Sequence, residues 1–216
     1  MANEPTQPKK PLYKRWWFWV LVIGVLYAIG KNSNQESSST SVQRIPTETS
    51  ETQPQRQSIP LPKKQIAFIA AIQSVKGEYE AAPNELKKSA VRTKRGKLIQ
   101  QALGNSRNIS DWVGILTDMQ TNSDGKAIIE IQLEGTDIKV KTWNNSMSDI
   151  FDNTLIPQAS RLYSAIAEMS KGQRVVFSGS FLSSDKGDYA EEASMTEAGS
   201  MSDPEFIFNF KSIRRY

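Results

Sequence analysis

The chain has 216 residues, a formal net charge of +4, and neither cysteine nor histidine. Without cysteine it has no disulfides and no lipid-modified cysteine anchor, so a domain outside the cytoplasm must be stable through its core alone. Without histidine it lacks the commonest general base and zinc ligand. These absences disfavour most enzyme classes, and we expect no catalytic residue, no cofactor and no metal.

An uncharged run of fifteen residues, 16–30 (WWFWVLVIGVLYAIG), lies near the N-terminus. It is shorter than the about 20 residues that usually span a bilayer, but interfacial tryptophans and snorkelling cations extend its usable length. The run predicts a transmembrane anchor over residues 15–31. The alternative is a cleaved signal peptide. Five aromatic residues in the run, and no small-x-small cleavage site directly after it, favour the uncleaved anchor.

The charges that flank the anchor predict its orientation. Residues 1–60 contain seven Lys or Arg and four Asp or Glu, whereas residues 61–216 contain 20 and 19. Four cations precede the anchor and only Lys31 follows it closely, so the positive-inside rule makes residues 1–14 a cytoplasmic tail. We therefore expect a single-pass protein of the cytoplasmic (inner) membrane with an extracytoplasmic C-terminal domain.

Residues 32–62 are rich in Ser, Thr, Gln, Asn and Pro and predict a disordered linker with a root-mean-square span of roughly 30 Å. Residues 63–104 predict a helical pair, because apolar residues recur on one helical face before Pro83 interrupts. Those residues are Phe68, Ile72, Val75 and Tyr79. Asn84 suits the N-cap of the second helix and Gly104 its C-terminal stop. The pair either precedes the main domain or packs on it.

The second predicted helix is strongly basic. Lys88, Arg92 and Arg95 share one face at i, i+4 and i+7. They form a candidate binding patch for phosphate, anionic lipid head groups or an acidic partner. The alternative is an ordinary solvated helix face, which is the commoner meaning of a charge run.

Strand patterns begin near residue 111. The predicted strands are 112–119, 126–133, 136–143, 173–182 and 205–213, with a helix over 155–170 between the third and fourth. Asp124-Gly125 predicts the turn between the first two strands. Gly179 predicts a bulge or tight bend in the fourth strand. Buried faces are predicted for the helix (Leu162, Ile166, Met169) and for the fifth strand (Phe206, Phe208, Phe210).

Three strands in a meander, a helix and two more strands form the element order of the five-stranded Greek-key barrel known as the OB fold. The segment KGQRVVFSGSF resembles the fourth strand of small bacterial OB-fold domains of the tRNA-anti-like kind, and this resemblance covers about residues 111–213. WNNSMSDIFDNTLIP and EFIFNFKSI resemble segments of membrane-anchored bacterial proteins of uncharacterised function. KKPLYKRWWFWV resembles the leading helix of small bacterial surface proteins.

The expected architecture is therefore an N-terminal single transmembrane helix followed by an α+β, mainly β, region. Two leading helices come before an OB-fold domain at residues 111–214. The resemblance implies this fold and no activity.

OB folds bind ligands across strands two and three, framed by the loops after strands one and four. That face predicts Lys139, Lys141 and Trp143 as ligand-binding residues, a set suited to single-stranded nucleic acid or to stacking on a sugar. Strand alternation alone can also produce such a set, with Trp143 covering the barrel edge and both lysines in solvent.

The loop after the fourth strand, residues 183–205, contains seven carboxylates and one lysine. This net charge of −6 makes nucleic acid an unlikely partner, because phosphate binding needs cations. The loop can instead bind a divalent cation, although it lacks EF-hand spacing, or meet the basic helix of a neighbouring copy.

The favoured hypothesis is a non-enzymatic, membrane-tethered, extracytoplasmic OB-fold module that recognises a protein or cell-envelope ligand. A second hypothesis reverses the topology and makes the chain a cytoplasm-facing binder of single-stranded nucleic acid. A third is a hydrolase that uses Asp149 and Asp152, which paired carboxylates allow. Two aspartates three residues apart beside Asn and Ser more often cap a helix or stabilise turns.

Overall fold

The computed structural model describes residues 60–216 except residue 187. The predicted tail (1–14), anchor (15–31) and most of the linker (32–62) lie outside these residues. Among the residues that are described, no helix is both long and apolar enough to cross a membrane. Residues 56–216 form one compact unit.

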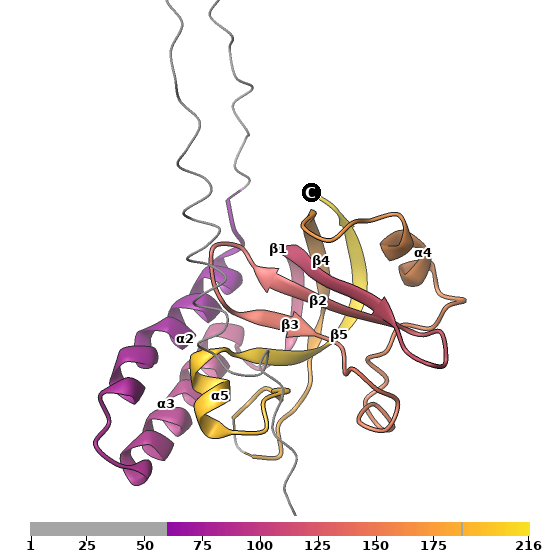
Figure 1. Cartoon of the computed structure of the whole chain (residues 1–216). Helices are drawn as coiled ribbons and strands as arrows, with labels where there is room; N and C mark the ends of the chain where they lie inside the picture. The colour runs from indigo at the N-terminus through magenta and orange to yellow at the C-terminus, as the bar shows by residue number, and fades with distance from the viewer. Residues whose placement is uncertain (1–59, 187) are drawn as a thin grey trace, which may run out of the picture. The chain divides into compact units, whose positions relative to one another are not determined.

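Five strands close into a barrel in the order β1-β2-β3-β5-β4 (Figure 1). They are β1 (Asn108–Thr121), β2 (Ala127–Leu133), β3 (Lys139–Lys141), β4 (Arg174–Phe181) and β5 (Glu205–Arg215). β3 and β5 run parallel, and the other neighbouring strands are antiparallel. The helices are α2 (Lys63–Glu80), α3 (Glu85–Leu103), α4 (Arg161–Ala167) and α5 (Glu197–Ser202). The closed five-stranded barrel, with α4 between β3 and β4, is consistent with an OB-like barrel.

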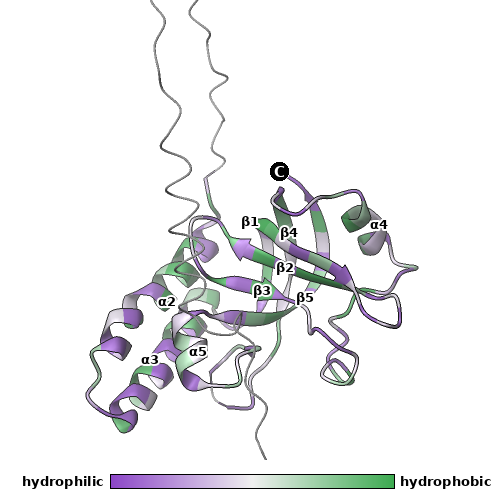
Figure 2. Cartoon of the chain, viewed as in Figure 1, coloured by the Kyte–Doolittle hydropathy of each residue, from purple (hydrophilic) through white to green (hydrophobic). Residues whose placement is uncertain are grey.

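Alternation along the strands places the large apolar residues inside the barrel. Phe206 and Phe208 on β5 are fully buried and Phe210 is nearly so, as the sequence predicts. Ile129, Ile131 and Leu133 of β2 are fully buried in the same way. Hydrophobic residues occur along all the barrel strands (Figure 2).

The helical pair α2–α3 packs on the barrel, which settles the choice that the sequence left open. Phe68 of α2 is fully buried, and its ring centroid lies 5.2 Å from that of Trp112, 5.0 Å from Phe181 and 5.2 Å from Phe206. Gln65, also fully buried, donates to the carbonyl of Val113 (2.6 Å) and accepts from its amide (2.9 Å). The first turn of α2 therefore binds β1 much as another strand would.

The predicted limits of the two helices are confirmed. Asn84 is the N-cap of α3, and its side-chain oxygen accepts from the amide of Lys87 at 3.0 Å. Gly104 ends the helix with φ of +74°, which glycine adopts without the steric cost of a side chain.

Four elements differ from the sequence-based expectation. Strand β1 runs from Asn108 to Thr121 rather than over 112–119. Helix α4 begins at Arg161, because Ile156 pairs with Ala127 as an isolated bridge and Pro157 disfavours helical backbone at the residue before it. Of its predicted buried face, Ile166 and Met169 are buried and Leu162 is only partly so. Strand β3 has three residues rather than eight. A short helix, α5, lies within the loop for which the sequence predicted none.

Gly179 is required where β4 and β5 change register. The register shifts between Ser178 and Gly179, and a Cβ atom at Gly179 would lie 2.2 Å from the carbonyl oxygen of Asn209 and 2.5 Å from the Phe208 ring. The predicted irregularity is therefore present, and its cause is the close approach of β5.

We expect Gly179→Ala to lower the free energy of unfolding by about 1–3 kcal/mol, because the new methyl group meets a backbone carbonyl that cannot move away. Gly77→Ala is the matched control. In α2, a Cβ at Gly77 would meet no described atom within 4 Å apart from its chain neighbours and the helix's own backbone, so alanine should stabilise by about 0.5–1 kcal/mol through helix propensity. Urea unfolding measures both. Equal effects of the two substitutions would contradict the packing at Gly179.

Candidate functional site

A cleft of about 480 Å³ lies between the end of β3, the segment that follows it and the β4–β5 loop. We call it the β3 cleft. Two of the predicted residues, Lys141 and Trp143, line it, together with Lys186, Glu191 and Glu205. The third, Lys139, lies on the same outer face of the barrel and contacts Glu205. The structure thus brings the face predicted from strands two and three against the loop predicted to frame it.

Both lysines of this face are bound by carboxylates. The ammonium of Lys139 lies 3.1 Å from Asp203 and 3.3 Å from Glu205. The ammonium of Lys141 lies 3.0 Å from Glu205 and 3.1 Å from Glu130. Burial alone would lower the pKa of each lysine, but hydrogen bonds and charges from these carboxylates raise it. Two cations facing three anions give this face a net charge of −1.

Asp149 and Asp152, the two residues of the hydrolase hypothesis, hold Trp143 and the segment that follows it. The indole N–H of Trp143 donates to Asp152 at 2.7 Å. Asp149 is 4% exposed, and its two oxygens accept from the amide (2.5 Å) and hydroxyl (2.7 Å) of Thr154 and from the amide of Leu155 (3.1 Å). Both carboxylates therefore hold the segment after β3 in place, as the turn-stabilising interpretation expects.

The other wall of the cleft is the β4–β5 loop, and two arginines on the basic face of α3 bind it. Arg95 is 1% exposed, forms an ion pair with Glu192 and donates to the carbonyl of Ser200 at 2.6 Å. Arg92 binds Asp188 through two hydrogen bonds, one of 2.9 Å from Nε, and lies 3.6 Å from Glu197. These two arginines of the predicted patch bind a segment of the same chain and do not form a free ligand patch.

The remaining member of the patch, Lys88, pairs with Glu85 of its own helix at 3.1 Å. The acidic loop therefore meets the basic helix within one chain, whereas a neighbouring copy was one of the two alternatives that the sequence left open. Further contacts fix the loop: the hydroxyl of Tyr189 donates to the carbonyl of Gly104 at 2.6 Å, and Arg107 donates to the carbonyl of Tyr189 at 2.7 Å. The β4–β5 loop is thus a fixed wall of the cleft.

Sequence reasoning missed Glu192, the most perturbed carboxyl group. Burial, with a smaller contribution from the charge of Asp188, raises the pKa of Glu192 to about 7, even though the guanidinium of Arg95 acts in the opposite direction. Among the residues described, no hydrogen-bond partner contacts Glu192 Oε2 or Arg95 Nε. The sequence shows that the β4–β5 loop has more acidic than basic residues, but it does not show which carboxylate is buried.

Within residues 60–216, residue 187 aside, no group of three or more Asp or Glu side chains is placed to hold a metal ion. The acidic residues of the β4–β5 loop instead contact cations of the barrel and of α3. The cleft can accept a ligand through the partly buried Trp143, backbone groups and already paired charges.

We expect the stability of the protein to fall as pH rises through the titration of Glu192. The pKa of this carboxyl is raised from 4.5 to about 7 by folding, so between these values the folded chain holds a proton that the unfolded chain has lost. The free energy of unfolding should therefore decrease by up to about 3 kcal/mol from pH 4.5 to pH 7.

The measurement is urea unfolding of the wild type and of Glu192→Gln at several pH values. The difference between them isolates Glu192 from groups such as Asp118, whose pKa Lys171 lowers. The wild type should lose stability relative to the variant as pH rises to 7 and change little above it. A difference that does not vary with pH would contradict the burial of Glu192.

No protein-family model, no curated protein and no solved structure matches this chain.

Proposed function

We propose that the barrel is an OB-fold binding module that takes a protein or cell-envelope ligand in the β3 cleft and performs no chemistry on it. The module is displayed outside the cytoplasmic membrane by the apolar run at residues 16–30. The observation that carries the proposal is the β3 cleft itself, about 480 Å³ in volume. It lies against the strand face and the loop that OB folds use for ligands.

The electrostatics of the cleft support a ligand that is not a polyanion. The charged residues that line it are Lys141, Lys186, Glu191, Glu192 and Glu205, a net charge of −1 with Glu192 ionised and of 0 with Glu192 protonated. Lys139 and Lys141 are already bound to carboxylates. A nucleic acid would have to break these pairs and approach the carboxylates, without the free cations that supply most of such affinity.

The fixed walls of the cleft support recognition. One wall is held by Asp149 and Asp152, and the other by Arg92 and Arg95. A preformed site loses less conformational entropy when a ligand binds. Because both aspartates are used for structure, the same contacts weaken the hydrolase hypothesis.

The membrane location is supported by the sequence alone. An uncharged run of fifteen residues follows Lys14 and Arg15, and a polar linker separates it from the described domain. By the positive-inside rule the domain is extracytoplasmic.

Because the chain has no cysteine, a single introduced cysteine tests this topology. We expect Lys211→Cys, at an exposed position of β5, to react with a membrane-impermeant maleimide in intact spheroplasts. Thr6→Cys, in the predicted cytoplasmic tail, is the matched control and should react only after lysis. The opposite pattern of labelling would refute the extracytoplasmic location.

We also expect residues 56–216 to bind a single-stranded oligo(dT) of about 20 nucleotides no more tightly than about 100 µM at low salt, measured by fluorescence anisotropy. The paired lysines leave little positive charge for the phosphates. The double variant Lys139→Ala/Lys141→Ala should change this weak binding by less than about twofold. Micromolar or tighter binding that falls steeply with salt and is lost in the double variant would favour the nucleic-acid hypothesis instead.

A further inference from the structure

The segment between β3 and α4, residues 144–153, exposes three large apolar side chains while one of its aspartates is buried. Its aspartate Asp149 is 4% exposed, whereas Met147, Ile150 and Phe151 are 86%, 65% and 89% exposed. We call residues 144–153 the apolar loop. Isolated exposed apolar residues are ordinary, but three within five positions of one loop indicate a contact surface.

The apolar loop is fixed by hydrogen bonds of its polar groups. Besides the bonds of Asp149, the amide of Ser148 donates to Asn145 Oδ1 at 2.8 Å, and Asn122 of the β1–β2 turn donates to Ser146 at 2.9 Å. Asn209 of β5 donates to the carbonyl of Asn153 at 3.3 Å. The loop thus holds its apolar side chains outward in one arrangement, which lowers the entropic cost of burying them against a partner.

A second surface lies at the other flank of the domain, where α2 turns into α3. A groove of about 520 Å³ is present there, which we call the hairpin groove. Its apolar lining consists of small side chains: Ala81, Ala82, Pro83, Ala90 and Val91. Its charged residues are Lys87, Lys94 and Glu78, a net charge of +1, with Lys94 and Glu78 paired at 2.6 Å.

The two surfaces are complementary in character and in charge. The apolar loop offers protruding apolar side chains and has no cation, and its half-buried Asp152 is its carboxylate at the surface. The hairpin groove is hollow, apolar and net positive. The loop and the tip of the hairpin lie on opposite sides of the domain (Figure 1), so they cannot meet within one chain.

We propose that the apolar loop of one copy docks in the hairpin groove of a second copy. The contact is head-to-tail, so each associated pair retains one free loop and one free groove and can add further copies. A lipid surface suits the loop less well, because residues 143–160 contain no Lys or Arg to attract anionic head groups. Asn144, Asn145 and Ser148 of the apolar loop also line the β3 cleft, but the docking side chains Met147, Ile150 and Phe151 do not.

Residues 56–216 form a compact unit with its own hydrophobic core, so this unit can be studied in solution. Sedimentation velocity from about 1 to about 500 µM should show species larger than a dimer as concentration rises. Phe151→Asp removes the loop's protruding ring, and Ala90→Arg fills the groove. Each should raise the dissociation constant at least about tenfold, because burial of one large apolar side chain is lost.

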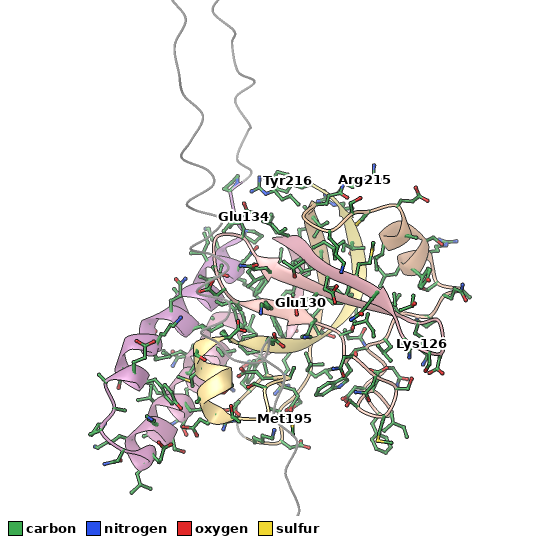
Figure 3. All side chains as sticks on the ribbon, in the orientation of Figure 1. Lys126, Glu130, Glu134, Met195, Arg215 and Tyr216 are labelled. Carbon is green, nitrogen blue, oxygen red and sulfur yellow. The ribbon has the colours of Figure 1, made fainter. Side chains whose placement is uncertain are left out.

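Mixing the two variants provides the sharpest test. Phe151→Asp retains an intact groove and Ala90→Arg retains an intact loop, so an equimolar mixture should form a dimer of one copy of each and nothing larger. Met195→Asp is the matched control. Met195 lies on the β4–β5 loop (Figure 3) and is 99% exposed. It lines the β3 cleft but belongs to neither docking surface, so this variant should associate like the wild type. Circular dichroism verifies that every variant is folded.

Three results would overturn the proposal. One is a wild type that stays monomeric over the whole concentration range. Another is a mixture of folded variants that yields no dimer. The third is a monomeric domain that cosediments with vesicles of phosphatidylethanolamine and phosphatidylglycerol through Phe151, which would assign the loop to a lipid surface.

Discussion

The core of this protein depends on one aromatic side chain that the barrel itself does not supply. Phe68 comes from α2, yet its ring packs among Trp112 of β1, Phe181 of β4 and Phe206 of β5. Burial of a Phe side chain contributes about 1.5–3 kcal/mol, and the barrel loses this contribution if α2 moves away. The hairpin is therefore part of the domain's core, and its place on the barrel is fixed by packing and by the amide of Gln65.

The position of α3 follows from that packing, and the shape of the β3 cleft follows from α3. Once α2 is seated, Arg92 and Arg95 lie where they bind Asp188 and Glu192 of the β4–β5 loop. The Arg95–Glu192 contact is buried and the Arg92–Asp188 contact is partly buried, so both are screened by salt less than exposed ion pairs are. One wall of the cleft, the β4–β5 loop, is thus held by side chains 96 and 97 residues earlier in the sequence.

Local patterns predicted most of the fold, whereas long-range partners could not be read from the sequence. Helical spacing identified the buried face of α2, Asn84 identified the start of α3, and strand alternation identified the buried residues of β2 and β5. The site was predicted less completely. Lys139, Lys141 and Trp143 do lie on the expected face, but nothing local says that each lysine meets a carboxylate some 60 residues away, or that Arg95 is buried. The sequence shows that α3 is basic and that the β4–β5 loop is acidic, but it does not show whether they meet within one chain or between two.

The pairing of β5 has a consequence for how the domain is synthesised. β5 is the last barrel strand in chain order, and it pairs with β3 and β4 and supplies Phe206 to the ring cluster around Phe68. Contacts between residues so far apart form late, because the intervening chain must first be brought together. Until β5 has been synthesised, the chain lacks Phe206 to cover Phe68. The exposed apolar surface of such a chain is of the kind that chaperones bind. Cooperative closure by the final strand makes any chain that stops short of β5 a substrate for proteolysis.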